Sequence, residues 1–167
     1  YLLIGDAPGA EEDKSGIPFF GRAGSELDYF LSLAGIVRSE VYVTNVVRCR
    51  PPGNRTPKPG EIVTCRQWLL KEIEWVQPKV VILLGATAVN AMLPGTKLTQ
   101  HGVPYWRDGV AYVPMYHPAA VLHKPLLRGV IEGDWKALPE RLKPNKHTDF
   151  YLGEWLHLAP LVGASHL

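Results

Sequence analysis

Short apolar runs alternate with longer amphipathic stretches along this chain. Four runs that are rich in apolar or β-branched residues are predicted to be strands: 1–4, 41–47, 79–85 and 109–115. Apolar residues spaced three or four positions apart predict helices at 25–34, 61–76 and 86–93, and a further helix is predicted at 135–142. Because strands that alternate with helices favour a parallel sheet, we expect an α/β fold. The predicted architecture is three-layer α/β/α, with a central parallel sheet of about four strands.

Turn and capping residues mark the ends of these elements. Ser25 is predicted to cap the helix that ends before Gly35, and Pro78 stops the helix that precedes it. Segment 10–24 is rich in acids and glycines and is expected to be too irregular for a helix. Segment 48–60 is rich in proline and is predicted to be a long loop, which in a compact domain is usually functional or disordered.

Length and composition fit one globular domain. The chain has 167 residues, and none of its apolar runs approaches the roughly 18 residues of a membrane span. We therefore expect a single domain over residues 1–167, no membrane association, and a monomer. Two cysteines are too few for a disulfide framework, which favours the reducing cytoplasm. The chain begins with Tyr1 inside a predicted strand, so we expect an N-terminal segment upstream of it, and no clear period follows Asn145.

Net charge gives weak guidance to a partner. The formal charge is only +2, so a nucleic-acid partner must be argued from local clustering. Basic residues do cluster in one segment, at Arg48, Arg50, Arg55, Lys58 and Arg66. Such a loop is more often a solvated surface than a phosphate contact, so on its own it favours the solvated surface.

Three polar residues lie where predicted strands end. Asp6 follows the first strand, Asn45 lies near the end of the second, and His117 follows the last. Because the carboxyl ends of parallel strands meet at one edge of a sheet, we expect these residues to line one cleft.

Each of these residues has a functional and a structural interpretation. The proline after His117 holds it in extended geometry, where its ring can donate a hydrogen bond to an oxygen that gains negative charge; the alternative is a surface-loop histidine. The amide of Asn45 matches a pyrimidine pairing edge, because it offers a donor beside an acceptor. The alternative is that Asn45 satisfies nearby backbone groups.

Two further groups are expected near the same cleft. One is an acidic cluster that consists of Asp6, Glu11, Glu12 and Asp13. Its carboxylates could activate water or stabilise positive charge, although an acidic loop is usually solvated. The other is the aromatic pair Phe19 and Phe20, which could stack on a base, although aromatic residues are more often core residues.

The order and spacing of these residues resemble a known family. The runs Gly5-Asp6-Ala7-Pro8-Gly9-Ala10-Glu11-Glu12-Asp13 and Gly16-Ile17-Pro18-Phe19-Phe20-Gly21-Arg22-Ala23-Gly24 closely resemble the first motif region of the family 4 uracil-DNA glycosylases. The resemblance continues through Thr44-Asn45-Val46-Val47-Arg48-Cys49-Arg50-Pro51-Pro52-Gly53-Asn54-Arg55 and Tyr116-His117-Pro118-Ala119, and covers roughly residues 1–137. It implies hydrolysis of the N-glycosidic bond of a uracil flipped out of DNA, which leaves an abasic site, as in base excision repair.

The resemblance also implies roles for individual residues. Asp6, Glu12 and His117 are implied to be catalytic: Asp6 would position water or stabilise the sugar cation, and His117 would stabilise charge on the departing base. Contacts with the base are implied for Ala7, Phe19, Asn45 and Asn54. Contacts with DNA are implied for Gly9, Gly24, Ser25, Arg55, Ala119, Val121, Leu122 and His123. Among these, the glycines and Ser25 would let backbone amides approach phosphates, and segment 121–123 would press into the duplex.

The resemblance implies a metal cofactor as well. Family 4 members hold a four-iron four-sulfur (4Fe-4S) cluster with four cysteines, and Cys49 and Cys65 match two of these metal ligands. The other two lie upstream of the first motif, in a segment that this sequence does not contain, so either that segment supplies them or the cluster has been lost. Without the resemblance, the two cysteines would be interpreted as buried thiols.

Two departures from the family pattern keep other functions open. Asp6 stands where the family usually has glutamate, and Phe20 stands where it commonly has a smaller apolar residue. The alternatives are a superfamily member that excises another modified or damaged base, for instance in defence against foreign DNA, and a catalytically idle nucleic-acid-binding module. The expected partner is DNA that contains uracil or another modified base. A nucleotide-phosphate-binding fold is disfavoured, because the turn at Gly5 lacks the residues of a P-loop and of a dinucleotide fingerprint.

Overall fold

The computed structural model describes residues 1–143 of the chain. Five strands form its sheet: β1 (Leu2–Gly5), β2 (Tyr42–Asn45), β3 (Val80–Leu84), β4 (Tyr105–Arg107) and β5 (Val110–Met115). The helices are α1 (Ala10–Ser15), α2 (Arg22–Leu33), α3 (Pro59–Val76), α4 (Ala86–Met92), α5 (Ala120–His123) and α6 (Arg128–Arg141). Short 3-10 turns lie at 38–40, 52–54, 98–100 and 125–127. The expectation for the chain beyond Asn145 concerns residues outside this described range.

The sheet confirms the predicted fold class. Its order is β2-β1-β3-β5-β4, and the pairings of β1 with β2, β1 with β3 and β3 with β5 are all parallel. The fifth strand, β4, was not predicted and pairs antiparallel with β5. A hairpin turn at Asp108 and Gly109 joins them, with φ angles of 49° and 78° that suit an Asp-Gly turn. The strand is only three residues long, which is too short for an alternating pattern to appear in the sequence.

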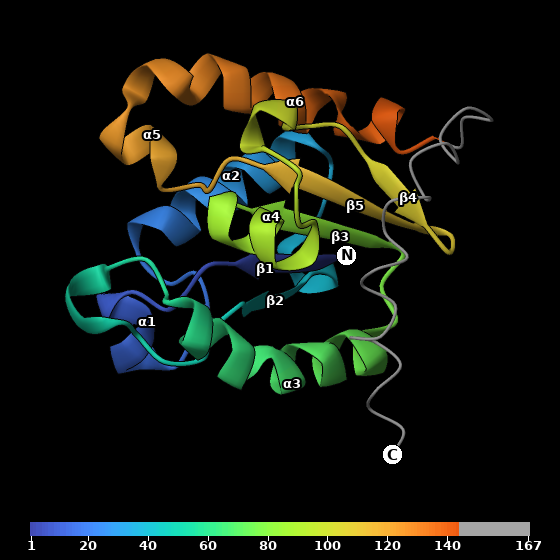
Figure 1. The fold of residues 1–167 in the computed structure, drawn as a ribbon. Coiled ribbons are helices and arrows are strands. Elements are labelled where there is room, and N and C mark those ends of the chain that lie inside the picture. The colour runs from blue at the N-terminus through green and yellow to red at the C-terminus, as the bar shows by residue number, and fades with distance from the viewer. Residues whose placement is uncertain (144–167) are drawn as a thin grey trace.

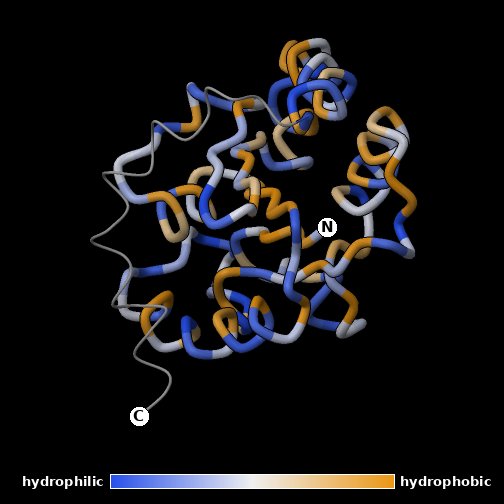
Figure 2. The backbone as a smooth tube through the Cα atoms, turned by 90° about the vertical axis from the view of Figure 1, so that its right-hand side faces the viewer, coloured by the Kyte–Doolittle hydropathy of each residue, from blue (hydrophilic) through white to orange (hydrophobic). Residues whose placement is uncertain are grey.

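Helices cover both faces of the sheet, as Figure 1 shows for α6 and α3 on opposite sides. Successive residues of a strand point to opposite faces, so Leu3 and Ile82 pack in the core beneath α2 and α6, whereas Leu2 and Leu83 pack in the core beneath α3 and α4. Figure 2 shows hydrophobic segments of the backbone near the middle of the molecule. The result is the predicted three-layer arrangement.

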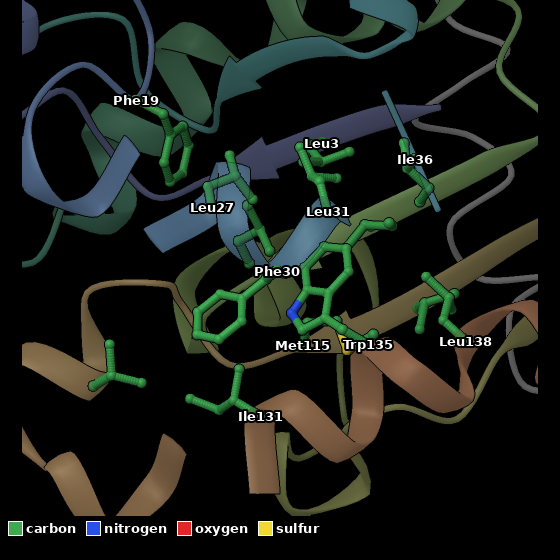
Figure 3. Close-up of a cluster of buried hydrophobic side chains, with 14 residues drawn as sticks. Leu3, Phe19, Leu27, Phe30, Leu31, Ile36, Met115, Ile131, Trp135 and Leu138 are labelled. Carbon is green, nitrogen blue, oxygen red and sulfur yellow. The ribbon is translucent and has the colours of Figure 1, made fainter. Parts of the chain in front are cut away.

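The core beneath α2 and α6 is built around stacked aromatic rings (Figure 3). Phe30 of α2 and Trp135 of α6 are fully buried, with ring centroids 6.4 Å apart and an interplanar angle of 7°. Phe19 lies at the edge of the same core (Figure 3). This places an aromatic residue of the first motif between the hydrophobic core and the carboxyl edge of the sheet.

Three local expectations were wrong. Segment 10–24 is not irregular throughout, because it contains α1 and the start of α2. Ser25 is not an N-cap: α2 begins at Arg22, and the Ser25 hydroxyl donates to the carbonyl oxygen of Gly21 from inside the helix. Helix α6 is longer than predicted, since it begins at Arg128 and continues to Arg141. Burial of its Trp135 outweighs the weak helix propensity of its glycines.

No helix within residues 1–143 is both long and apolar enough to cross a membrane.

Candidate active site

The carboxyl edge of the parallel strands carries a cavity of about 490 Å³. Asp6 follows β1, Asn45 ends β2 and His117 follows β5, and all three line this cavity. It lies where the chain order reverses, with β2 on one side of β1 and β3 on the other, which is the usual ligand position in such sheets. The prediction that the three residues share one cleft is confirmed.

Two glycines let the polar side chains approach one another. A Cβ atom on Gly85, directly after β3, would lie 3.2 Å from both carboxylate oxygens of Asp6 and 3.3 Å from Cβ of His117. A Cβ atom on Gly5 would lie 2.6 Å from Oδ1 of Asn45 and 2.8 Å from the ring of Phe19. Any larger residue at either position would therefore displace the groups that line the cavity.

His117 is held in one tautomer by its own loop. The backbone N–H of Ala119 donates to Nδ1 of His117 over 3.1 Å, so in the neutral ring the proton resides on Nε2. Burial, and to a lesser extent the charge of His123, lower the pKa of His117 from 6.5 to about 4. The ring of Phe19 stacks on it with centroids 5.3 Å apart. His117 is therefore a neutral, oriented Nε2–H donor at neutral pH.

Asp6 is a half-buried carboxylate in the wall of the cavity. Burial raises its pKa from 3.8 to about 6, while the backbone N–H of Ala88, which donates to Oδ1 over 3.1 Å, acts in the opposite direction. Ala88 lies in the first turn of α4, so the positive end of that helix faces the carboxylate. Asp6 is ionised at neutral pH, and its environment makes that charge costly.

Phe19 is fixed in a backbone conformation that few side chains adopt. Its φ angle is 53°, and its carbonyl oxygen lies against Gly24 of α2 so closely that a Cβ atom there would overlap it. Gly24 is buried, and it serves the position of Phe19. The DNA contact implied for Gly24 remains a prediction.

Most of the predicted site residues line the cavity together. Those that do are Asp6, Ala7, Gly9, Glu12, Phe19, Asn45, Asn54, Arg55, His117, Ala119 and His123. Gly24, Ser25, Val121 and Leu122 are not among its lining residues. Phe20 and Arg22 also line it, although the resemblance gave them no role.

Segment 121–123 lies in the short helix α5 and is only partly exposed. Val121 is 3% exposed and belongs to the core, Leu122 is half-buried and packs against that core, and His123 is exposed. The exposed apolar side chain of this region is Leu126, in the 3-10 turn that follows α5, with 97% of its surface accessible. Leu126 could not be told apart from its apolar neighbours by sequence, because only the local helix geometry decides which of them face the core.

The long loop after β2 brings two polar residues to the cavity. Asn54 adopts a left-handed φ of 55°, and its Oδ1 accepts a hydrogen bond from Nε of Arg50 over 2.7 Å. Arg55 forms an ion pair with Glu61 of α3 at 2.6 Å. The predicted loop is thus anchored at its end by a pair that also fixes the start of α3.

The two cysteines are free and are not both buried. Cys49 is exposed and Cys65, on α3, is half-buried, which argues against the interpretation as buried thiols. Sγ of Cys65 accepts a hydrogen bond from the backbone N–H of Arg48 over 3.5 Å. Residues 1–143 contain no group of three or more histidine, cysteine or acidic side chains arranged for a metal ion. As thiol donors the two cysteines suit an iron-sulfur cluster, but they supply two of the four ligands that it requires.

The comparison with known families agrees with this geometry. A family model described as the uracil DNA glycosylase superfamily matches residues 1–138, which include every residue of the cavity. The chain belongs to the uracil-DNA glycosylase superfamily.

Individual relatives show which group of the superfamily the chain resembles. A type-4 uracil-DNA glycosylase of Thermotoga maritima is 43% identical over 143 residues, covering 81% of this chain and 74% of the relative. A type-4 uracil-DNA glycosylase of Archaeoglobus fulgidus is 38% identical over 149 residues, covering 83% and 75%. One of Pyrobaculum aerophilum is 40% identical over 143 residues, covering 80% and 73%. The resemblance to the type-4 group that the motifs predict is confirmed.

Proposed function

We propose that this protein is a DNA glycosylase that hydrolyses the N-glycosidic bond of a uracil flipped out of DNA. The single observation that carries the proposal is the pairing of a neutral Nε2–H donor, His117, with a half-buried carboxylate, Asp6, in one cavity. Breaking this bond generates an anionic base and a cationic sugar, so the reaction needs a hydrogen-bond donor at one end and a negative charge at the other. The three type-4 uracil-DNA glycosylases to which the chain is similar support the same assignment.

His117 stabilises the departing base in this proposal. Its Nε2–H donates to the pyrimidine oxygen on which negative charge develops. Because its pKa is about 4, the ring is neutral under working conditions and needs no proton to act. The bond from Ala119 to Nδ1 fixes the ring before substrate binds, so little reorganisation is needed as charge develops.

Asp6 and Glu12 act on the sugar side. Asp6 stabilises the developing sugar cation or positions the attacking water, and Glu12, which lines the same cavity, supplies a second carboxylate near that position. Asp6 must be ionised for either role. Its pKa of about 6 therefore sets the lower end of the useful pH range.

The base is recognised by Asn45 and Phe19, which line the same cavity. Asn45 offers an amide donor and acceptor to the pairing edge of the base, and Phe19 supplies an apolar surface beside it. Gly5 allows these two side chains to approach each other as closely as they do. A water-excluding wall of this kind strengthens the hydrogen bonds that read the base.

We also propose that Cys49 and Cys65 are two ligands of a 4Fe-4S cluster whose other two thiolates come from outside residues 1–143. Such a cluster, when bound, would hold the segments around the two cysteines together, and no chemical step depends on it. The supporting observations are two free thiols, one exposed and one half-buried, and the N–H bond to Sγ of Cys65. Iron and acid-labile sulfide are assayed on the complete protein prepared without oxygen. About four irons per chain is the expected result, and absence of iron contradicts the proposal.

Excision from defined DNA tests the proposed reaction. A labelled oligonucleotide with one deoxyuridine is incubated with the protein and then treated with alkali, which cleaves at an abasic site. Cleavage at the uracil position by the unaltered protein, lost in His117→Ala, supports the proposal. Cleavage at another lesion without cleavage at uracil supports the related function, excision of a different base. The observation that favours this alternative is Phe20, which lines the cavity and is 47% exposed.

A further inference from the structure

Glu72 is an acidic residue in a position that is normally apolar. It is one of two buried residues on the 18-residue helix α3, the other being Leu69, and it is 5% exposed. Burial of a carboxylate is unfavourable unless several donors satisfy it. Apolar residues of similar volume often give equal or greater stability than a buried ion pair, so stability alone does not account for this arrangement.

Three donors meet the Glu72 carboxylate, and they come from two functional segments. Oε2 accepts from the hydroxyl of Thr44 over 2.6 Å, and Thr44 directly precedes Asn45 on β2. Oε1 accepts from Nη2 of Arg48 over 2.6 Å and from the hydroxyl of Tyr42 over 3.1 Å. The carboxylate therefore fixes the strand that carries Asn45 and the residue next to Cys49.

Arg48 extends this connection to the second cysteine. While its guanidinium is held by Glu72, its backbone N–H donates to Sγ of Cys65. Arg48 also lines a second cavity of about 270 Å³, and Thr44 and Asn45 line the same cavity. A continuous set of contacts thus runs from Cys65 through Arg48 and Glu72 to the residue before Asn45.

We propose that Glu72 is a positioning residue that couples the cysteine-bearing segment to the base-recognition residue Asn45. It contacts neither base nor sugar and acts by fixing Thr44 and Arg48. A disturbance at either cysteine reaches base recognition through this carboxylate. The inference rests on the proposed function for its rate measurement, but a second measurement, on the thiols, is independent of that function.

The first measurement is a double-mutant cycle in single-turnover excision of uracil. Glu72→Gln keeps the side-chain volume and removes the charge, so the charge-assisted bond from Arg48 weakens. We expect the rate to fall about tenfold in the natural background, the lower end of the effect seen for outer-shell partners. In an Asn45→Ala background we expect less than about a twofold fall, because the residue through which Glu72 acts is already absent. Equal falls in both backgrounds would indicate general destabilisation and overturn the proposal, as would an unchanged rate in the natural background.

The second measurement is the rate at which a thiol reagent modifies Cys65 in the complete protein, followed by mass analysis of the digested protein. A bound cluster must release Sγ before the reagent can react, so the rates are compared between preparations of equal iron content. Glu72→Gln and Arg48→Met are each expected to raise this rate several-fold, since both release the segment that covers Sγ. The control is Glu74→Gln, an exposed residue of the same helix, which should leave both the excision rate and the modification rate unchanged. Unchanged modification in Glu72→Gln overturns the coupling, even if the unaltered protein excises no uracil. Absence of excision with faster modification would refute the proposed function and leave the Glu72–cysteine contact supported.

Discussion

Asp6→Asn is predicted to make the protein more stable at high pH and much less active. The pKa of Asp6 is raised from 3.8 to about 6, so ionised Asp6 destabilises the folded state by about 3 kcal/mol at pH 8. Asparagine has nearly the same shape and keeps an oxygen that can accept from the N–H of Ala88, but it carries no charge. The substitution therefore removes the free-energy cost of an ionised group at this position, and it also removes the catalytic carboxylate.

The pH dependence separates this effect from other consequences of the substitution. Since the folded pKa lies above the unfolded one, stability is complete below pH 3.8 and is lost as the pH rises through about 6. At pH 4 the cost of ionising Asp6 is about 0.5 kcal/mol, so the advantage of Asp6→Asn should grow by about 2.5 kcal/mol between pH 4 and pH 8. Any effect of the new amide that does not depend on pH cancels when the stability differences at pH 4 and pH 8 are compared. The titration of His117 also cancels, provided that its pKa is the same in both proteins.

Urea unfolding of both proteins at pH 4 and pH 8 measures this difference. Single-turnover excision at pH 8 is measured in parallel and should fall by at least about 100-fold. Asp13→Asn removes an exposed carboxylate of α1 and controls for the loss of one negative charge from the same end of the sheet. Its stability advantage over the unaltered protein should not increase between pH 4 and pH 8. A stability difference that is the same at both pH values would refute the assigned burial cost, and full activity in Asp6→Asn would refute the catalytic role.

Three further predictions concern neighbouring features of the site. The single-turnover rate should rise with pH through about 6, as Asp6 ionises, and then stay level, because the pKa of His117 is about 4 and its ring is already neutral; a rate that falls again above about pH 6.5 would contradict the neutral donor. Gly85→Ala should lower stability by about 1–3 kcal/mol and slow excision, because its φ is 98° and its Cβ would contact Asp6 and His117; unfolding and rate measurements that match the unaltered protein would show that this contact is not restrictive. Leu126→Ala should slow excision from a duplex several-fold and leave excision from a single strand unchanged, because only a duplex has a stack for an apolar side chain to enter. Equal losses on both substrates would exclude a role for Leu126 in opening the duplex, and Val103→Ala is a matched control for removal of an exposed apolar side chain.

The sequence was sufficient to predict the three layers and the edge of the sheet at which the site lies, because both depend on local patterns. Apolar runs identified the four parallel strands, and the polar residues at their ends identified Asp6, Asn45 and His117 as neighbours in the fold. Parallel strands make this inference reliable, since all their carboxyl ends lie at one edge.

Features that depend on tertiary packing could not be predicted in the same way. The roles of Gly85 and Gly24 follow from which atoms lie opposite them, and nothing in the flanking sequence shows those atoms. Val121 and Leu126 are similar in chemistry, yet one is buried and the other exposed because the short helix α5 turns the first toward the core. The Glu72 contacts join residues up to 30 positions apart, and only the packing of α3 on β2 brings them together.

Excision of uracil from a single-stranded oligonucleotide by the complete protein tests the central claim most directly. Alkaline cleavage at the deoxyuridine should be seen with the unaltered protein and should fall by orders of magnitude in His117→Ala and Asn45→Ala, while binding to the DNA changes little. Binding without cleavage at uracil, or a parallel loss of binding and cleavage in both variants, would contradict the account.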